Sequence, residues 1–115
     1  MLKTQQNIAS FDFDNTLYEG YLSRPRLAII QELFDYYRNG YKIIIVTARH
    51  HSERAEIDEF ILEHKLPVQE IYFTNLTPKG PLLKQLNVEI HFDDCPDQLI
   101  STTLHGITAV NILEI

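Results

Sequence analysis

Short apolar segments alternate with helix-sized segments along this chain. Five of the apolar segments are rich in β-branched or aromatic residues and have the length of buried strands. They cover residues 8–13, 42–47, 70–74, 89–92 and 107–112. Strands that alternate with helices are typical of a parallel sheet joined by right-handed crossovers. The pattern therefore predicts an α/β fold whose sheet has five parallel strands.

The segments between these strands predict four helices. The clearest one lies between Pro25 and Gly40, residue types that suit the start of a helix and the position just past its end. A second helix is predicted to begin near Ser52 and to stop before Pro67. Two shorter helices are predicted at residues 81–86 and 96–104. The apolar face predicted for the first helix consists of Leu27, Ile30, Leu33, Phe34 and Tyr37.

The length of 115 residues fits one domain, and a domain of this size buries roughly two-thirds of the surface that its unfolded chain exposes. No apolar segment has the length that a bilayer requires, and residues 1–7 lack the pattern of an export signal. Cys95 is the single cysteine, so no internal disulfide can form, which fits a reducing compartment. We therefore expect one domain spanning residues 1–115, located in the cytoplasm and without membrane association.

The charge balance restricts the class of partner. Ten Lys and Arg residues stand against sixteen Asp and Glu residues, which gives a formal net charge of −6. Binding along a nucleic acid rests on clustered cations, and here the basic residues are scattered along the sequence. The charge therefore argues against a long polyanion as partner. It leaves open a short nucleic-acid end, a small molecule, or assembly of several copies of the chain.

Polar side chains follow three of the predicted strands at the point where each strand ends. Asp12 and Asp14 come at the end of the first strand, Thr47 and Arg49 at the end of the second, and Asp93-Asp94 after the fourth. Open α/β sheets bind ligands at this edge. Paired carboxylates there attract a hard divalent cation, and one of them can attack phosphorus while the other handles the leaving-group proton. The pattern predicts a phosphoryl-transfer site.

The order of these residues resembles the four motifs of the haloacid dehalogenase (HAD) superfamily of phosphohydrolases. The residues that carry the resemblance are, in chain order, Asp12, Asp14, Thr16, Thr47, Lys79 and the pair Asp93-Asp94. The resemblance spans most of the chain and implies a three-layer, Rossmann-like domain. It implies that Asp12 is the nucleophile that forms an aspartyl-phosphate and that Asp14 is the general acid and base. It also implies that Thr47 donates its hydroxyl to the phosphoryl oxygens and that Lys79 balances negative charge.

The same resemblance implies a bound Mg²⁺. Its ligands would be the Asp12 carboxylate, the main-chain carbonyl of Asp14 and an acid of the fourth motif. We expect Asp94 to be that direct ligand and Asp93 to act in the outer shell, but the sequence leaves open which of the two touches the ion. Inside the fourth strand, His91 is expected to be a structural residue.

The string Val46-Thr47-Ala48-Arg49 resembles the second motif of polynucleotide 3′-phosphatases and class B acid phosphatases. In those proteins an arginine at this position helps to grip the substrate. We therefore expect Arg49, together with Asn15 and Thr16 of the first motif, to contact the substrate. A nucleotide or a nucleic-acid phosphate end ranks first among phosphomonoester substrates, ahead of a phosphosugar or a phosphoprotein. The alternative for Arg49 is an ion pair with Glu53.

The connections between the motifs are short. Seven residues separate Thr16 from Arg24, and only a helix and a strand fit between Arg49 and Lys79. There is no room for a cap domain at either place, so a capless member of the superfamily is predicted. The resemblance implies that capless members act on macromolecular ends, phosphoproteins or openly bound phosphoesters. Asp14 favours phosphate esters, because the dehalogenating branch lacks a proton donor at this position.

Two other functions are compatible with a fold of this kind. A receiver domain of two-component signalling has a similar length, five strands, a phosphorylated Asp, a Thr and a Lys. The order differs, because Lys79 precedes Asp93 here and the candidate nucleophile lies on the first strand. A non-catalytic phosphate-binding or regulatory module is the other alternative, and the intact motif residues count against it.

Overall fold

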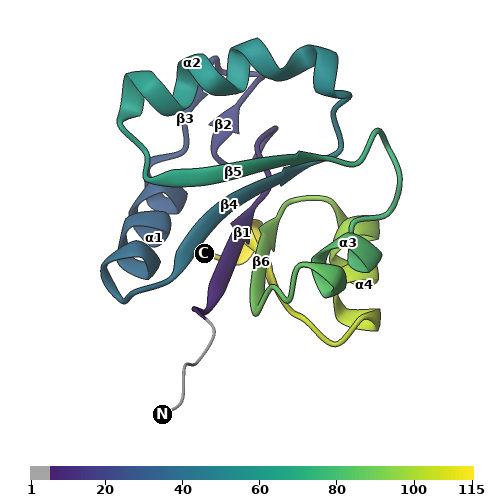
Figure 1. The fold of residues 1–115 in the computed structure, drawn as a ribbon. Helices are drawn as coiled ribbons and strands as arrows, with labels where there is room; N and C mark the ends of the chain where they lie inside the picture. Colours follow the sequence, from purple (N-terminus) through teal and green to yellow (C-terminus); the bar gives the residue numbers. More distant parts are fainter. Residues whose placement is uncertain (1–5) are drawn as a thin grey trace.

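The computed structural model describes residues 6–115, which form a five-stranded parallel sheet with helices on both faces (Figure 1). The strands of the sheet are β1 (Ile8–Phe11), β4 (Lys42–Thr47), β5 (Val68–Phe73), β6 (Ile90–Asp93) and β7 (Thr108–Asn111). The helices are α1 (Leu27–Arg38), α2 (Arg54–His64), α3 (Gly80–Gln85) and α4 (Pro96–Leu104), with short 3₁₀ helices η1 (His51–Glu53) and η2 (Ile112–Glu114). The three-layer α/β fold and its parallel sheet are confirmed, and the strand boundaries differ from the predicted ones by at most two residues.

The helices divide between the two faces because the strand order reverses at β1. The strands lie in the order β5-β4-β1-β6-β7. The chain runs outward from β1 to β4 and β5 with α1 and α2 on one face, and then adds β6 and β7 on the other side of β1 with α3 and α4 on the opposite face (Figure 1). β1 and β6 are thus neighbours whose following helices cover different faces. Open α/β sheets bind ligands beyond the carboxyl ends of two such strands.

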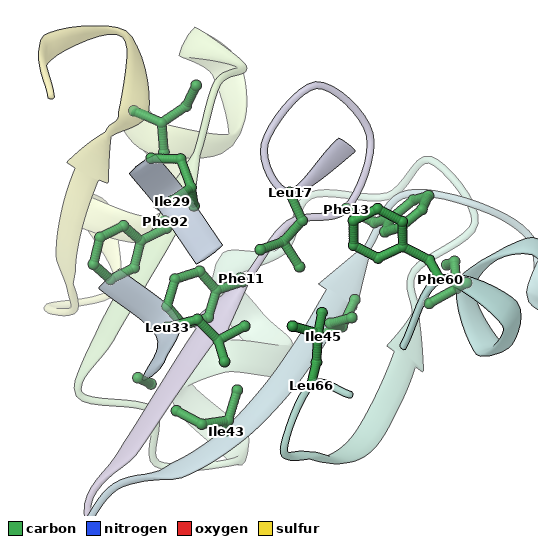
Figure 2. Packing of buried hydrophobic residues seen from close by; sticks show 13 residues of the cluster. Phe11, Phe13, Leu17, Ile29, Leu33, Ile43, Ile45, Phe60, Leu66 and Phe92 are labelled. Carbon is green, nitrogen blue, oxygen red and sulfur yellow. The ribbon is translucent and has the colours of Figure 1, made fainter. Parts of the chain in front are cut away.

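The larger core lies between the sheet and the layer of α1 and α2 (Figure 2). Phe11 of β1 and Phe92 of β6 stack in it with 4.5 Å between the ring centroids. Phe60 of α2 packs edge-on against Phe13 at 5.2 Å. Burial of a phenylalanine side chain contributes roughly 1.5–3 kcal/mol. Because the buried rings of Phe11 and Phe13 flank Asp12, the core fixes the position of that carboxylate.

A smaller core lies between the other face of the sheet and α3. Its buried members are Ile44, Val46, Leu83, Val88 and Ile107. The central strand β4 is therefore buried on both sides, which explains why its sequence reads as a continuous apolar run rather than an alternating one.

The side of helix α1 that packs on the sheet differs from the predicted one. Ile29 and Leu33 are buried, whereas Leu27 is 72% exposed and Tyr37 is also exposed. Tyr36 joins the buried side by packing edge-on against an aromatic ring of β6. The start of this helix is apolar at every position, so spacing alone could not show which edge would meet the sheet.

The first strand ends at Phe11, two residues earlier than predicted, because Phe13 begins a tight turn. The carbonyl oxygen of Phe13 accepts main-chain hydrogen bonds from residues 16, 17 and 18 at 3.2, 3.1 and 3.1 Å. A small antiparallel hairpin follows, β2 (Tyr18–Glu19) and β3 (Arg24–Pro25), which the sequence pattern did not predict. Strands of two residues are too short to show an alternating pattern.

The connections that follow β1 and β5 are short in the described part of the chain. Between β1 and α1 the chain holds the β2–β3 hairpin, and between β5 and α3 it holds residues 74–79. None of the helices within residues 6–115 combines the length and the apolar character that crossing a bilayer needs.

Candidate active site

Three neighbouring strand ends carry the candidate site. Asp12 follows β1, Thr47 ends β4, and Asp93 ends β6 with Asp94 directly after it. β1 pairs in parallel with both β4 and β6, so the three carboxyl ends lie side by side. The candidate residues therefore lie at the carboxyl edge of the sheet, where the sequence predicted them, and the structure adds that this is the point where the strand order reverses.

Asp12 is held by its main chain and by both of its carboxylate oxygens. Its N–H donates to the carbonyl oxygen of Phe92 at 2.9 Å, which extends the pairing of β1 with β6. Its Oδ1 accepts a hydrogen bond from Lys79 Nζ at 3.0 Å, and its Oδ2 accepts one from Thr16 Oγ1 at 3.1 Å. Asp12 is only 6% exposed, so the candidate nucleophile is fixed and nearly buried.

Lys79 is the buried cation of the site. Its Nζ donates to Asp12 Oδ1 at 3.0 Å and to Asp93 Oδ2 at 2.7 Å. Burial disfavours the charged amine, but the carboxylates of Asp12 and Asp93 outweigh burial and raise the pKa of Lys79 above its ordinary value. Lys79 is thus a permanent positive charge between two acids.

The start of α3 is docked against α4, and this contact aims Lys79 at the acids. The N–H of Lys79 donates to Gln98 Oε1 at 2.9 Å, and the N–H of Gly80 donates to Ser101 Oγ at 3.0 Å. A Cβ atom at Gly80 would overlap the carbonyl oxygen of Ser101 and the ring of His105. The absence of a side chain at Gly80 therefore permits the close approach that positions Lys79.

Asp93 is fully buried and its oxygens accept four hydrogen bonds. Oδ2 accepts from Lys79 and lies 2.8 Å from His91 Nε2. Oδ1 accepts from the main-chain N–H groups of Asp94 at 2.9 Å and Cys95 at 3.1 Å. Burial raises the pKa of this carboxyl, but His91 and Lys79 outweigh burial and lower it. Asp93 is therefore ionised, and its roughly four lone-pair positions are in use.

Asp94 is the acid that remains accessible to a ligand. It is half-buried, and its Oδ1 lies 3.3 Å from the Thr16 hydroxyl that also contacts Asp12. One oxygen each from Asp12, Asp93 and Asp94 can be chosen so that all three lie within 4.8 Å of one another. Carboxylate oxygens are the ligands that hard divalent cations prefer, so this cluster could bind a metal ion. Because Asp93 is saturated, Asp12 and Asp94 are better disposed to hold it.

The two carboxylates that share Lys79 differ in their affinity for a proton. Burial raises the pKa of Asp12 well above its ordinary value, Lys79 opposes this rise, and the negative charge of Asp93 adds to it. Asp93 keeps its charge, and Asp12 binds a proton more readily. A cation beside Asp12 would favour the ionised form of that carboxyl.

Arg49 and Asp14 form a two-pronged ion pair. Arg49 Nε donates to Asp14 Oδ2 at 2.9 Å, and Nη2 donates to Oδ1 at 2.8 Å. Nη2 also donates to Glu56 Oε1 at 2.8 Å, and the guanidinium lies over the ring of Phe13. The hydrogen bonds from Arg49 to Asp14 raise the pKa of Arg49 further above its ordinary value. The predicted partner Glu53 is wrong, because Arg49 touches only its main-chain carbonyl, and the carboxylate of Glu53 caps η1 instead.

Thr47 and Asn15 shape the loops on which they lie. Thr47 is buried, and its Oγ1 accepts a hydrogen bond from the N–H of Arg49 at 3.2 Å. Asn15 is exposed in a left-handed conformation, and its side-chain oxygen accepts from the N–H of Gly20 at 3.3 Å. Direct hydrogen bonds join the predicted site residues into two groups. One group contains Asp12, Thr16, Lys79, Asp93 and Asp94, and the other contains Asp14, Thr47 and Arg49.

Comparison with known proteins gives a likeness of fold. No family model and no curated protein matches this sequence. A chain in the structure of the Pnkp1/Rnl/Hen1 RNA repair complex is similar, with a TM-score of 0.77 and 15% identity over 92% of this chain. A chain in a second structure of the Pnkp1/Rnl/Hen1 complex has a TM-score of 0.72 and 15% identity over 95%. BT1666 from Bacteroides thetaiotaomicron, one of the phosphatases of the HAD superfamily, has a TM-score of 0.46 and 20% identity, with 95% of this chain and 51% of BT1666 covered.

The matched region is only part of the two similar RNA repair chains. This chain spans 42% of the first and 47% of the second, which is less than half of their length. At 15% identity the likeness concerns the fold, which is Rossmann-like and consistent with the HAD type that the motif order predicts.

Three side chains of the site were not assigned a role from the sequence. Gln98 holds the main chain of Lys79, Glu56 holds Arg49, and Ser10 lies against His91. For Glu56 a signal existed, since it is one turn beyond Glu53 on the predicted helix. The contact of Gln98 joins two helices and that of Ser10 joins two strands, so neither follows from local spacing.

Proposed function

We propose that this chain is a Mg²⁺-dependent phosphomonoester hydrolase of the capless HAD type that acts through an aspartyl-phosphate on Asp12. The observation that carries the proposal is the buried contact of Lys79 with both Asp12 and Asp93, next to the accessible Asp94. Phosphoryl transfer spreads negative charge over the equatorial oxygens of phosphorus, so it needs fixed cations and donors around a nucleophile. The alternative of a binding module without turnover remains an outcome of the test below.

The reaction has two steps. In the first, a carboxylate oxygen of Asp12 attacks phosphorus, the bond between phosphorus and the leaving oxygen breaks, and protonated Asp14 gives its proton to that oxygen. In the second, water attacks the phosphorus of the aspartyl-phosphate, Asp14 takes a proton from the water, and the bond between phosphorus and Asp12 breaks. The products are an alcohol and inorganic phosphate, and both acids return to their starting state.

The remaining motif residues bind the phosphoryl group and the ion. Asp12, Asp94 and the main-chain carbonyl of Asp14 would hold Mg²⁺, with Asp93 in the outer shell. Bound there, Mg²⁺ supplies positive charge that neutralises the phosphoryl oxygens. Lys79 uses two of its three N–H bonds on Asp12 and Asp93, and the third would donate to a phosphoryl oxygen bound beside Asp12.

The Arg49–Asp14 pair has to open during this cycle. While both oxygens of Asp14 accept hydrogen bonds from Arg49, neither is free to exchange a proton with the leaving oxygen. A substrate phosphate offers Arg49 the same two-pronged geometry. We infer that Arg49 exchanges Asp14 for the substrate phosphate, which frees Asp14 for the leaving oxygen. Glu56 contacts the same Nη2 atom and would keep Arg49 near the site during the exchange.

The proposed substrate is a nucleotide or the phosphate end of a nucleic acid, encountered in the cytoplasm. The support is the Val46-Thr47-Ala48-Arg49 string and the likeness of fold to chains of an RNA repair complex. The short connections at residues 12–26 and 74–79 also support this proposal, because they leave no room for a domain that would close the approach of a terminal phosphate. Asn15 and Thr16 would lie beside this approach.

Phosphate release from a panel of phosphomonoesters tests the proposal. The panel contains nucleotides, a phosphosugar, a phosphopeptide, and oligonucleotides with 3′- or 5′-phosphate, each with Mg²⁺ or with a chelator. Turnover that requires both Mg²⁺ and Asp12, with Asp12→Asn as the control, is the expected result. Folded protein that binds Mg²⁺ and phosphate without releasing phosphate from any substrate would point to the binding module instead.

A further inference from the structure

A row of buried polar side chains runs beneath the site, from β1 to β6. Ser10 and His91 are partners in the parallel pairing of these strands, and both are completely buried. Ser10 Oγ lies 2.6 Å from His91 Nδ1, and His91 Nε2 lies 2.8 Å from Asp93 Oδ2. The row continues from Asp93 through Lys79 to Asp12. A chain of hydrogen bonds therefore joins the middle of the sheet to the candidate nucleophile.

The partners of His91 fix the direction of these hydrogen bonds. Asp93 accepts hydrogen bonds from the Lys79 amine and from two main-chain N–H groups, so its carboxylate acts as the acceptor here too and the proton facing it belongs to His91 Nε2. In the neutral ring Nδ1 is then an acceptor, and the hydroxyl of Ser10 donates to it. The hydrogens thus point from Ser10 to His91 and from His91 to Asp93. This order predicts the Nε2–H tautomer for His91.

His91 restrains the same oxygen of Asp93 that binds Lys79. Residues 91 and 93 are two apart in β6, so their side chains lie on one face of the strand. Oδ2 of Asp93 therefore has one donor from its own strand, His91, and one from the start of α3, Lys79. Without His91 the carboxylate would lose one of the two contacts that fix Oδ2, and the Lys79 amine would lose the rigid acceptor that sets its distance to Asp12.

We infer that His91, seated by Ser10, is a positioning residue for the proposed phosphoryl transfer: it fixes the carboxylate of Asp93 and, through Asp93, the amine of Lys79 against Asp12. The inference rests on the proposed function. Neither Ser10 nor His91 is placed to touch the phosphoryl group. Their effect reaches the reaction only through the hydrogen bonds of Asp93.

Two substitutions of His91 by amides test whether its hydrogen bond to Asp93 matters or only the space that the ring fills. In His91→Gln the amide nitrogen can stand where Nε2 stood and donate to Asp93. In His91→Asn the shorter amide reaches the position of Nδ1, near Ser10, and leaves Asp93 without this donor. Mutating a residue that supports a metal-ligating side chain by a hydrogen bond costs about 10–100-fold in affinity or activity, and His91 supports Asp93 in a comparable way.

We therefore expect His91→Asn to lower kcat by about 10–100-fold with little change in KM, and His91→Gln to restore most of the loss. Ser10→Ala removes only the hydrogen bond between Ser10 and the His91 ring, so it should lower kcat less than His91→Asn. Circular dichroism and urea unfolding establish that each variant is folded. Equal kcat values for folded His91→Asn and wild-type protein would overturn the inference.

The tautomer of His91 gives a test that needs no turnover and no variant. Long-range ¹H–¹⁵N correlation NMR of the wild-type protein should find the proton on Nε2 and an unprotonated Nδ1. A proton on Nδ1 facing Ser10, with Nε2 bare, would overturn the inference whether or not phosphate is released. Wild-type protein with the Nε2–H tautomer but no turnover on any phosphomonoester would overturn the proposed function and leave the hydrogen-bond order intact.

Discussion

At Asp12, a proton and a metal ion compete for the same carboxylate oxygens. Burial raises the pKa of this carboxyl above the ordinary value of about 4. Mg²⁺ binding then has to displace the proton wherever the pH lies below the raised pKa. We expect the affinity for Mg²⁺ to increase with pH up to the raised pKa and to level off above it. Isothermal titration calorimetry in buffers of different ionisation enthalpy measures the protons that binding releases.

Asp12→Asn is the control for this competition. The amide is similar in size to the carboxyl but has no acidic proton, so Mg²⁺ should bind more weakly and release fewer protons than in the wild-type protein. The comparison is made at a pH where the wild-type protein releases protons on binding Mg²⁺. If Asp12→Asn releases the same number, the protons come from another group, and the raised pKa of Asp12 is contradicted.

Lys79→Met tests the buried cation. Methionine fills similar space but leaves the carboxylates of Asp12 and Asp93 facing each other without a positive charge. Removing one partner of a buried ion pair costs about 3–5 kcal/mol. We expect the free energy of unfolding at pH 7, measured with urea, to fall by about this amount. Added Mg²⁺ should restore part of the loss, because it binds the folded state beside Asp12.

Lys84→Met is the matched control, because Lys84 lies on α3, the helix that begins directly after Lys79, and is exposed. Its replacement should change the free energy of unfolding by less than about 0.5 kcal/mol. If Lys79→Met is no less stable than Lys84→Met in chelator, the two acids do not depend on this lysine, and the central contact of the site is wrong.

Arg49→Ala tests whether this arginine grips the substrate phosphate. Hydrogen bonds to a charged group contribute roughly 1.5–3 kcal/mol, so KM should rise about tenfold or more. Steady-state kinetics with a substrate identified by the panel measures the change. Arg54→Ala is the control, since Arg54 is half-exposed and pairs with Asp58 on its own helix. Equal KM values for the two variants would limit Arg49 to the pairing with Asp14 and Glu56.

At the scale of elements, the packing of α3 against α4 decides where Lys79 lies. Gly80→Ala would put a methyl group into the carbonyl oxygen of Ser101 and the ring of His105. Overpacking of this kind costs typically about 1–3 kcal/mol, and α3 has to move away to relieve it. We expect lower stability in urea together with a lower kcat, because the shift moves the amine of Lys79 away from Asp12.

Gly20→Ala is the control for the glycine change. Gly20 lies in the hairpin, where the nearest atom to an added Cβ, Asn15 Oδ1, is 3.8 Å away. The substitution should leave both stability and kcat near the wild-type values. A Gly80→Ala protein with normal kcat would mean that Lys79 keeps its position without the close contact of the two helices.

The five strands of the large sheet and the four α-helices could be predicted, because each has a local signal in its apolar spacing and its terminal residues. The two-residue strands β2 and β3 have no such signal. The positions of Asp12 and Asp94 after predicted strands, and of Lys79 at the start of a predicted helix, also predicted that these residues lie at one edge of the sheet. Other features depend on tertiary contacts that leave no local signal. The buried edge of α1 depends on which side meets an aromatic ring of β6, and the pairing of Arg49 with Asp14 depends on the distance between two loops.

At the scale of the whole molecule, the charge should decide how a nucleic-acid end approaches. Acidic residues outnumber basic ones by sixteen to ten. Three of the acids lie on α2: Glu56 binds Arg49, and Glu59 and Glu63 line a hollow between α2 and the β2–β3 hairpin together with Phe13. A polyanion that lies across α2 would meet these carboxylates. A single terminal phosphate that enters from the side of Asp12 would not.

This arrangement predicts an unusual dependence on salt. Proteins that bind along nucleic acids lose affinity steeply as salt rises, because they release counterions. Here added salt would instead screen repulsion between α2 and the nucleotides behind the terminal phosphate, over distances of about 10 Å at 0.1 M. We expect kcat/KM for a phosphorylated oligonucleotide to stay level or rise with salt, and not to increase with oligonucleotide length. Kinetics on a mononucleotide and on oligonucleotides of increasing length measures both effects.

The double variant Glu59→Gln, Glu63→Gln isolates the contribution of α2, because both residues are exposed and neither contacts Asp12 or Lys79. Removing two negative charges should raise kcat/KM for a long oligonucleotide at low salt and leave the mononucleotide unchanged. A steep fall of kcat/KM with salt in the wild-type protein would instead require cations along the path of the nucleic acid. Since the basic side chains of the site, Lys79 and Arg49, already bind carboxylates, such a result would favour a second chain as the source of those cations.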